Sequence, residues 1–158
     1  MALTLLLTGV QGQLGRALQA RLAHHRLHAL GRDQLDLADA DACRNAVLNL
    51  KPDWVLNAGA YTAVDQAERE PDQAHAVNAL APAAMAEALL ALGRGRLLQI
   101  STDFVFSGAQ GVPYAATPLL PHHNEALGVY GASKAQGELA VMQRLGVCTA
   151  NGPQRVNS

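Results

Sequence analysis

The feature that most constrains the fold is a group of three glycines near the N-terminus. Gly9, Gly12 and Gly15 follow an apolar run, Leu3 to Leu7, and open a segment whose leucines have helical spacing. A strand, a tight glycine turn and a helix form the first unit of a dinucleotide-binding fold. Glycine lets the backbone approach a pyrophosphate, and the free amides at the helix start favour an anion. The alternative is a glycine turn with a structural role only, and the strand–turn–helix context favours dinucleotide binding.

Apolar runs and helical segments alternate along the rest of the chain. The pattern predicts helices over residues 13–24, 42–50, 75–92 and 129–145, and strands over 27–30, 54–56 and 97–101, with another strand beginning at 147–149. Pro82 interrupts the third of these helices, so a kink or a restart is expected there. Short apolar strands separated by helices predict an α/β fold with a doubly wound parallel sheet. We therefore expect one Rossmann-like NAD(P)-binding domain over residues 1–149.

Composition narrows the class of partner. Twelve basic and 13 acidic residues leave a net charge of −1, and 49% of the residues are hydrophobic, which is a globular composition without a basic patch. Nucleic acid is therefore not an expected partner. The apolar start of the chain is too short to span a bilayer, so no membrane partner is expected. Cys43 and Cys148 are far apart and suit packing in a reduced, cytoplasmic protein.

The histidines do not indicate a metal site. His24, His25 and His28 lie near the end of the first helix, and His122 and His123 lie in the segment Ser107 to Gly128, which is rich in Gly, Pro and His and reads as a loop. Neither group has a set of partners at the spacing of metal ligands. We expect both groups to be surface or helix-end residues.

The end of the second strand bears on the choice of cofactor. An acidic residue at this position would bind the ribose hydroxyls of NAD, but the chain has Gly31 followed by Arg32. A cation there can accept the 2′-phosphate of NADP, or it can be a solvated surface arginine. Asp36 and Leu37 follow shortly and are candidates for the adenine side of the site.

Tyr130 and Lys134 are the strongest catalytic candidates. They are four residues apart in a predicted helix, so they share one helix face. A free tyrosine, with a pKa near ~10, is a poor acid at neutral pH, and a nearby ammonium favours the phenolate. Thr102 follows the fourth predicted strand, at the sheet edge where open parallel sheets bind ligands. A Tyr-x-x-x-Lys pattern alone is common by chance. Here the pair follows a glycine motif and this strand, and this order makes it a more specific indication of a catalytic site.

Four segments resemble the extended short-chain dehydrogenase/reductase family, and within it the dTDP-4-dehydrorhamnose reductases. They are Gly9 to Gly15, Asn57 to Glu68, Ser101 to Phe106 and Tyr130 to Glu138, and the likeness runs from Leu3 to about Leu145. The second and third segments are far more specific than the glycine motif. The resemblance implies an NADPH- or NADH-dependent reduction of the 4-keto group of a dTDP-linked deoxyhexose, dTDP-4-dehydro-6-deoxy-L-mannose, to dTDP-L-rhamnose, a precursor of surface polysaccharide.

The resemblance also implies roles for individual residues. Those expected at the cofactor are the phosphate contacts Gly12, Gln13 and Leu14, the adenine neighbours Asp36 and Leu37, and the nicotinamide neighbours Ala60, Tyr61 and Thr62. Those expected at the sugar are Thr102 and Asp103, with Tyr130 as the catalytic acid and Lys134 as its partner on the nicotinamide ribose. A homodimer and a bound Mg²⁺ are compatible with the family, although no Mg²⁺ ligands are identified in this chain.

Three features depart from the family pattern. Gly31 replaces the usual acid, which leaves the choice between NAD and NADP open. The stretch Pro118 to Gly128 carries two histidines where a shorter polar turn is usual. Family members also run considerably further, so we expect a chain cut short before a C-terminal substrate domain, with Ala150 to Ser158 as a non-family tail.

Two other functions stay open at this point. One is a non-catalytic dinucleotide-binding or regulatory subunit of the same fold, such as the beta subunit of methionine adenosyltransferase. The other is a nucleotide-sugar epimerase or dehydratase of the family. Family dehydratases place a glutamate after the Ser-Thr-Asp run, and this chain has Phe104 there, so a dehydratase is disfavoured.

Overall fold

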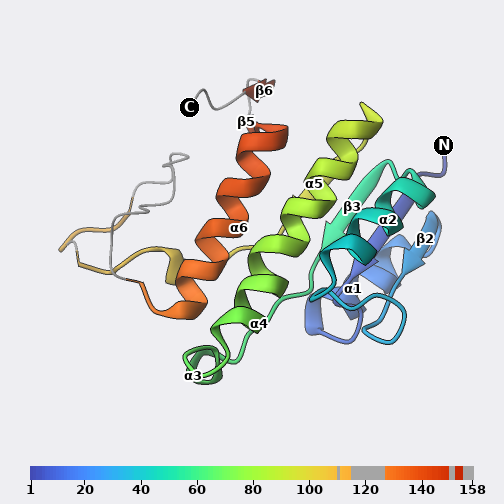
Figure 1. Ribbon diagram of the computed structural model, residues 1–158. Helices are drawn as coiled ribbons and strands as arrows, with labels where there is room; N and C mark the ends of the chain where they lie inside the picture. Colours follow the sequence, from blue (N-terminus) through green and yellow to red (C-terminus); the bar gives the residue numbers. More distant parts are fainter. Residues whose placement is uncertain (110, 115–126, 150–151, 155–158) are drawn as a thin grey trace.

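The computed structural model describes residues 1–109, 111–114, 127–149 and 152–154. Its centre is a sheet of four parallel strands in the order β2-β1-β3-β4 (Figure 1). The strands are β1 (Thr4–Thr8), β2 (Arg26–Ala29), β3 (Trp54–Asn57) and β4 (Arg96–Gln99). Each strand begins or ends within two residues of the predicted position, and the predicted α/β class is confirmed.

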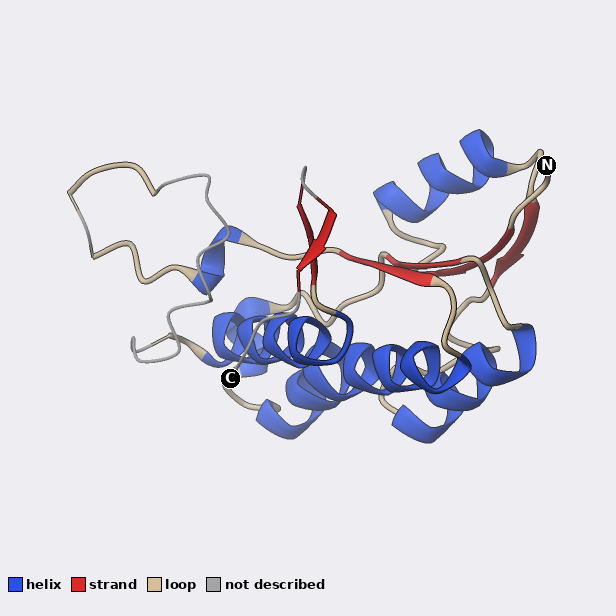
Figure 2. Ribbon diagram, turned by 90° about the horizontal axis from the view of Figure 1, so that it is seen from above, coloured by secondary structure: helices blue, strands red, loops and turns tan. Residues whose placement is uncertain are grey.

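Helices cover both faces of this sheet. They are α1 (Gln13–Leu22), α2 (Ala40–Leu50), α3 (Val64–Ala67), α4 (Pro71–His75), α5 (Ala81–Leu92) and α6 (Val129–Leu145). A 3₁₀ turn, Asp103–Val105, follows β4. Figure 2 shows α1 on one face of the sheet and the remaining helices together on the other. This arrangement is the doubly wound layering that alternating strands and helices predict.

The core lies between the sheet and the layer formed by α2, α5 and α6. Leu6 of β1 and Val55 of β3 are fully buried there against Val47 of α2 and Met85 of α5. Cys43 also lies in this cluster as a free thiol, and burial raises its pKa to about 12. The predicted packing role of Cys43 is therefore confirmed, whereas the side chain of Cys148 lies outside the described part of the chain.

The helical segment around Pro82 is irregular, as the proline predicts. Helices α4 and α5 are joined by a π-helical turn, Ala76–Leu80, and Pro82 stands in the first turn of α5. Proline has no N–H, so it cannot bond the carbonyl of Asn78 as an α-helix would require. The helix begins at Pro71, earlier than the expected His75, because a proline is favourable in a first turn.

The combined helical run Pro71–Leu92 is long and apolar enough to cross a membrane. Within the fold, 61% of its most apolar window is buried, and α5 packs against α2 and α6. It is therefore the core helix of this domain. It is the single such run in the described part of the chain.

The C-terminal end differs from the predicted pattern. The segment β5 (Val147–Thr149) is a strand, but it pairs antiparallel with β6 (Gly152–Gln154) and not with the parallel sheet. The expectation of a strand at residues 147–149 is therefore confirmed, although this strand lies outside the four-stranded parallel sheet. The pattern also predicts no strand for residues 152–154, because that stretch has no apolar run. Residues 110, 115–126, 150–151 and 155–158 lie outside the described residues, as do the predictions for His122, His123 and most of the tail.

Candidate functional site

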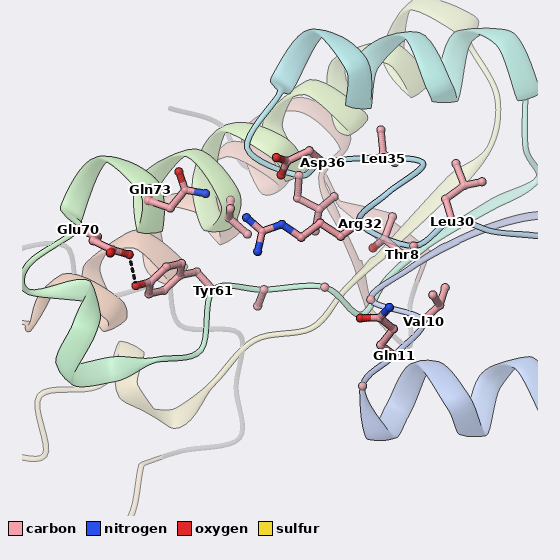
Figure 3. Close-up of a pocket in the computed structure, with 17 residues that line it drawn as sticks. Thr8, Val10, Gln11, Leu30, Arg32, Leu35, Asp36, Tyr61, Glu70 and Gln73 are labelled. Atoms are coloured by element: carbon pink, nitrogen blue, oxygen red, sulfur yellow. Dashed lines mark hydrogen bonds between the residues drawn. The ribbon is translucent and has the colours of Figure 1, made fainter.

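A cleft of about 650 Å³ opens at the carboxyl ends of β1, β2 and β3 (Figure 3). Strand β1 pairs with β2 on one side and with β3 on the other, so the chain changes direction across the sheet at β1. Ligands of open α/β sheets bind at this switch point. The predicted residues that line the cleft are Gly9, Gly12, Arg32, Asp36, Leu37, Ala60 and Tyr61. Gln13, Leu14, Gly15 and Thr62 are not among the lining residues.

The three glycines of the first turn have different surroundings. A Cβ on Gly9 would lie 2.4 Å from the backbone of Ala58, and a Cβ on Gly15 would lie 2.1 Å from the carbonyl oxygen of Gly9. Gly9 also has a φ of 66°, which favours glycine. These two positions are glycine because the backbone packs against itself. A Cβ on Gly12, in contrast, would meet only the Gly9 oxygen, at 3.4 Å, and Gly12 lines the cleft.

This contrast tests whether the turn fits a dinucleotide. The protein itself leaves room for a side chain at residue 12, but that side chain would occupy part of the cleft. Gly12, the N-cap residue of α1, lines the same space, and α1 has no side-chain cap at its N-terminus. Unpaired amides and a helix dipole favour the phosphates of a dinucleotide. The residues present therefore fit the group that the sequence predicts.

A side chain of α1 holds the glycine turn in place. The Gln19 amide donates to the carbonyl oxygens of Val10, at 2.9 Å, and Gly15, at 3.3 Å. The backbone amide of Gly12 donates to the Gly9 oxygen at 3.0 Å. The glycine turn is thus held by the Gln19 side chain of α1 and by its own backbone hydrogen bond.

The end of β2 provides the positive charge of the cleft. Figure 3 shows the guanidinium of Arg32 directed into the cleft, and no ion pair of Arg32 occurs among the described residues. The backbone before it is fixed, because the amide of Gly31 donates to the Gln34 side chain at 3.1 Å. Asp36 lines the same wall and accepts from the amide of Ala38. A cation that is not neutralised by a neighbour can meet an anionic ligand.

A hydrogen-bonded pair closes the other end of the cleft. The Tyr61 hydroxyl donates to the Glu70 carboxylate at 2.7 Å, and the Gln66 amide donates to the other oxygen of Glu70 at 2.8 Å. The bond raises the pKa of Tyr61 and lowers the pKa of Glu70, because it stabilises the phenol and the carboxylate together. The sequence analysis did not predict a role for Glu70. The sequence offers only one indication of it, which is that a glutamate closely follows the specific segment Asn57–Glu68.

Tyr130 and the segment after β4, which carries Thr102, pack together beside the cleft. Tyr130 is buried next to Ala67 and Ala74, and Tyr61 of the cleft wall packs on this cluster. The Phe104 ring meets the Tyr130 ring edge-on, with centroids 5.5 Å apart. Thr102 caps the 3₁₀ turn by accepting from the amide of Phe104, and it donates to Asp103 at 3.3 Å.

Lys134 is almost fully buried and donates to the carbonyl oxygen of Ile100 at 2.6 Å. Burial lowers the pKa of its ammonium, and the carboxylate of Glu138 opposes this shift. The structure thus brings the segment that carries Thr102 against α6, where Lys134 bonds Ile100 and Tyr130 packs on Phe104. It does not put them on the wall of the main cleft, since Tyr61 stands between the cleft and Tyr130.

Asn78 of the π-helical turn joins the cleft wall to α6. Its side-chain oxygen accepts from the Tyr61 amide at 2.9 Å, and its nitrogen donates to the Tyr61 carbonyl and to the Ser133 hydroxyl, both at 3.0 Å. A Cβ on Gly137 of α6 would lie 2.1 Å from the Asn78 carbonyl oxygen. The sequence analysis did not predict this role for Asn78 and Ser133. The sequence indicates it only in that each is a polar residue inside an apolar helical run.

Metal binding has no support from the described residues, among which no three His, Cys, Asp or Glu side chains gather in a suitable arrangement. The His24 and His25 rings contact each other with centroids 4.0 Å apart, and His25 accepts from the backbone amide of Leu3. These contacts are structural.

Comparisons with known sequences agree with one another. The family model described as RmlD substrate binding domain matches residues 3–149. A dTDP-4-dehydrorhamnose reductase of Streptomyces griseus is 44% identical over 142 residues, which are 89% of this chain and 45% of that protein. A probable dTDP-4,6-dihydroxy-2-methyloxan-3-one 4-ketoreductase of Streptomyces antibioticus is 41% identical, over 91% of this chain and 48% of its own length.

A solved structure has the same fold. The crystal structure of dTDP-4-dehydrorhamnose reductase from Bacillus anthracis in complex with NADP matches with a TM-score of 0.76 and 32% identity, over 91% of this chain and 50% of that chain. The chain therefore spans about half the length of the relatives that it matches.

Proposed function

Because this chain belongs to the RmlD substrate binding domain family, we propose that it is the cofactor-binding and proton-donating part of an NADPH-dependent reductase of nucleotide-linked 4-keto sugars. The observation that carries the proposal is the position of Tyr130 and Lys134 beside a cleft that fits a dinucleotide. A buried lysine ammonium one helical turn from a tyrosine, at the sheet edge where such folds bind ligands, favours a catalytic part over a non-catalytic subunit.

The cofactor lies, in this proposal, along the cleft from the glycine turn to Tyr61. Gly12, Gln13 and Leu14 hold the phosphates at the start of α1, and Gly9 and Gly15 shape the turn. Asp36 and Leu37 flank the adenine, and Ala60, Tyr61 and Thr62 line the nicotinamide side. Arg32 supports NADPH over NADH, because its guanidinium points into the cleft and can pair with a 2′-phosphate. The complex of the Bacillus anthracis reductase with NADP supports the same choice.

The nicotinamide cofactor, when bound, supplies a hydride to the carbonyl carbon of the sugar. Tyr130 donates the proton to the carbonyl oxygen, and Thr102 and Asp103 orient the sugar by hydrogen bonds. Lys134 holds the nicotinamide ribose and favours the phenolate left after proton transfer. Phe104, packed edge-on against Tyr130, restricts the orientation of the phenol ring.

The substrate class follows from the family, and we propose dTDP-4-dehydro-6-deoxy-L-mannose, the substrate of rhamnose formation. The names of the Streptomyces relatives both describe reduction of a dTDP-linked 4-keto group. The 4-keto group is thus the feature that we expect this chain to recognise.

The decisive experiment compares chain 1–158 with its Tyr130→Phe variant. NADPH is titrated by fluorescence, and hydride transfer to the keto sugar is followed by loss of NADPH absorbance. Loss of a positioned acid lowers the rate about a hundred- to ten-thousand-fold, while the affinity for NADPH stays within a factor of about two to three. Equal and measurable rates in the two proteins would remove Tyr130 from the chemistry. Failure of the unmodified chain to bind NADPH would refute the cofactor assignment.

A further inference from the structure

A row of polar side chains crosses the carboxyl ends of three neighbouring strands. Thr8, Asn57 and Gln99 are the last residues of β1, β3 and β4, and they are partners in the sheet register. Adjacent register partners of a parallel sheet lie about 4.8 Å apart with their side chains on the same face. Thr8 and Asn57 are about 1% exposed, so these polar groups need partners within the protein.

Each side chain of the row donates to the next. The Thr8 hydroxyl donates to the side-chain oxygen of Asn57 at 2.5 Å, and the Asn57 nitrogen donates to the side-chain oxygen of Gln99 at 2.7 Å. The Gln99 nitrogen donates to the carbonyl oxygen of Ile100 at 3.0 Å. The same oxygen accepts from the Lys134 ammonium at 2.6 Å. The row therefore runs from a residue of the cleft wall, Thr8, to the lysine beside Tyr130.

The direction of the row is set by the Ile100 carbonyl. A carbonyl oxygen can only accept, so one lone pair takes the Lys134 ammonium and the other takes the Gln99 nitrogen. This orients the Gln99 amide with its oxygen toward Asn57, and the Asn57 amide with its oxygen toward Thr8. A reversed Gln99 amide would set its nitrogen against the Asn57 nitrogen, and a reversed Asn57 amide would set its oxygen against the Gln99 oxygen, so either reversal loses a hydrogen bond of the row.

From this geometry we infer that Gln99 is a positioning residue for Lys134. Its amide holds the Ile100 carbonyl that anchors the ammonium, and Asn57 and Thr8 hold Gln99 in turn. The inference rests on the proposed function only in the purpose that it gives to the row, which is to present Lys134 to the nicotinamide ribose and to Tyr130. The row itself, and its effect on Lys134, do not depend on turnover.

The chain offers a clean spectroscopic test, because Lys51 and Lys134 are its only two lysines. Lysine labelled with ¹³Cε and ¹⁵Nζ gives two signals, and Lys51, at the exposed end of α2, serves as the internal reference. In Gln99→Glu the new carboxylate still accepts from Asn57 and lies within reach of the ammonium. We expect the pKa of Lys134 to rise by about one pH unit or more, while the Lys51 titration is unchanged.

Two further variants separate positioning from general effects of charge. Gln136→Glu adds the same charge at an exposed position of α6, two residues from Lys134, and should leave the Lys134 titration close to that of the unmodified chain. Thr8→Val keeps the side-chain shape of Thr8, the first residue of the row, and removes its hydroxyl donor. The change should reach Lys134 through Asn57 and Gln99 and shift the Lys134 signals. If Gln99→Glu does not fold, Thr8→Val alone decides the question.

Unchanged Lys134 signals in both Gln99→Glu and Thr8→Val would overturn the inference. An equal rise of the Lys134 pKa in Gln99→Glu and Gln136→Glu would also overturn it, since the effect would then be one of charge alone. In Gln99→His the new side chain still offers one donor and one acceptor. The Lys134 signals of this variant should therefore stay close to those of the unmodified chain.

A kinetic comparison tests the purpose of the row separately. If the keto sugar is reduced, the pH dependence of hydride transfer should move in the Gln99→Glu variant together with the Lys134 titration, and it should not move in Gln136→Glu. Turnover in Gln99→Glu with an unshifted pH dependence would contradict the purpose of the row, while the positioning of Lys134 is decided by the lysine signals.

Discussion

Gly9, Gly12 and Gly15 belong to one motif but are glycine for different reasons. At Gly9 and Gly15 a Cβ would collide with backbone atoms at 2.4 and 2.1 Å, whereas at Gly12 it would make only a contact of 3.4 Å. The motif thus combines two positions required by packing with one that keeps the cleft open. Stability and ligand binding can be separated by mutating them individually.

We expect Gly12→Val to fold normally and to lose NADPH affinity by at least about tenfold, which is about 1.4 kcal/mol. Gly15→Ala should instead lower the free energy of unfolding by about 1–3 kcal/mol, because its Cβ forces the turn apart from α1. Urea unfolding and fluorescence titration measure the two quantities. NADPH affinity in Gly12→Val equal to that of the unmodified chain would contradict the assigned phosphate site.

Arg32 is the residue that we expect to distinguish the two cofactors. A charge-assisted hydrogen bond contributes about 1.5–3 kcal/mol, so Arg32→Ala should weaken NADPH binding by about tenfold or more. NADH has no 2′-phosphate and should lose little affinity. Arg21→Ala, which makes the same charge change at the far end of α1, is the control. Equal losses for NADPH and NADH would show that Arg32 is only a surface charge.

At the scale of elements, helix α6 depends on a distant residue for its N-terminal cap. Gly128, at the N-cap position, has no side chain to offer, and the Glu68 carboxylate accepts from the Val129 amide at 2.8 Å instead. A Cβ on Gly128 would lie 3.0 Å from that carboxylate oxygen. The segment after α3 therefore caps the helix that carries Tyr130 and Lys134.

Glu68→Ala should lower the free energy of unfolding by about 0.5–2 kcal/mol, the usual cost of a lost cap. The double variant Glu68→Ala/Gly128→Asp should recover most of this, because residue 128 has an extended conformation, with φ −62° and ψ 163°, that suits a local cap. Asp65→Ala, an exposed change on α3, is the matched control. Urea unfolding measures all four proteins, and a double variant no more stable than Glu68→Ala would exclude the capping role.

Asp53 joins the starts of β1 and β3 and gives the sheet a dependence on pH. Its carboxylate accepts from the Thr4 amide at 2.8 Å and from Arg94 at 2.6 Å. The bond from the Thr4 amide, supported by Arg94, lowers the pKa of Asp53 below its ordinary value of 3.8. The unfolded chain then takes up the proton more readily, so this stabilisation is present above pH 3.8 and is lost as the pH falls through the lower folded value.

Asp53→Asn should therefore reduce stability near neutral pH and flatten the loss of stability in acid. Urea midpoints at a series of pH values from about 6 to about 2.5 measure the effect. Midpoints that fall in parallel for the two proteins would show that another carboxyl group is responsible for the acid sensitivity.

For the whole molecule, the cleft unites segments that are distant in the chain. Its walls come from the turn after β1, the loop after β2, the loop after β3 and helix α4 (Figure 3). A ligand that contacts all of them binds only the folded state and must stabilise it. This coupling extends to α6 through Asn78 and Ser133.

NADPH at about a hundred times its dissociation constant should stabilise the fold by ~2.7 kcal/mol. For a chain of this size the expected rise in Tm is roughly 5–10 °C. Thermal unfolding followed by circular dichroism measures it, with Gly12→Val as the control: an affinity at least about tenfold lower should give about half this rise or less at the same NADPH concentration. A rise of the same size in that variant would mean that NADPH binds elsewhere.

Much of the fold was predictable because its signals are local. The apolar runs of β1 and β3 and the helical spacing over residues 129–145 depend on nearby side chains alone, and these elements lie where the pattern predicts. The glycine turn, the Tyr130–Lys134 pair and the end of β4 were likewise readable, because the topology of alternating strands and helices brings the carboxyl ends of parallel strands to one edge.

What only the tertiary structure decided depends on contacts between distant residues. The capping of Val129 by Glu68, the bonds of Asn78 to Tyr61 and Ser133, and the row from Thr8 through Asn57 and Gln99 each join different elements. The pairing of β5 with β6 was also decided there. A sequence pattern records the periodicity of one segment, whereas a buried hydrogen bond requires two side chains to meet, and only the packed chain determines which ones do.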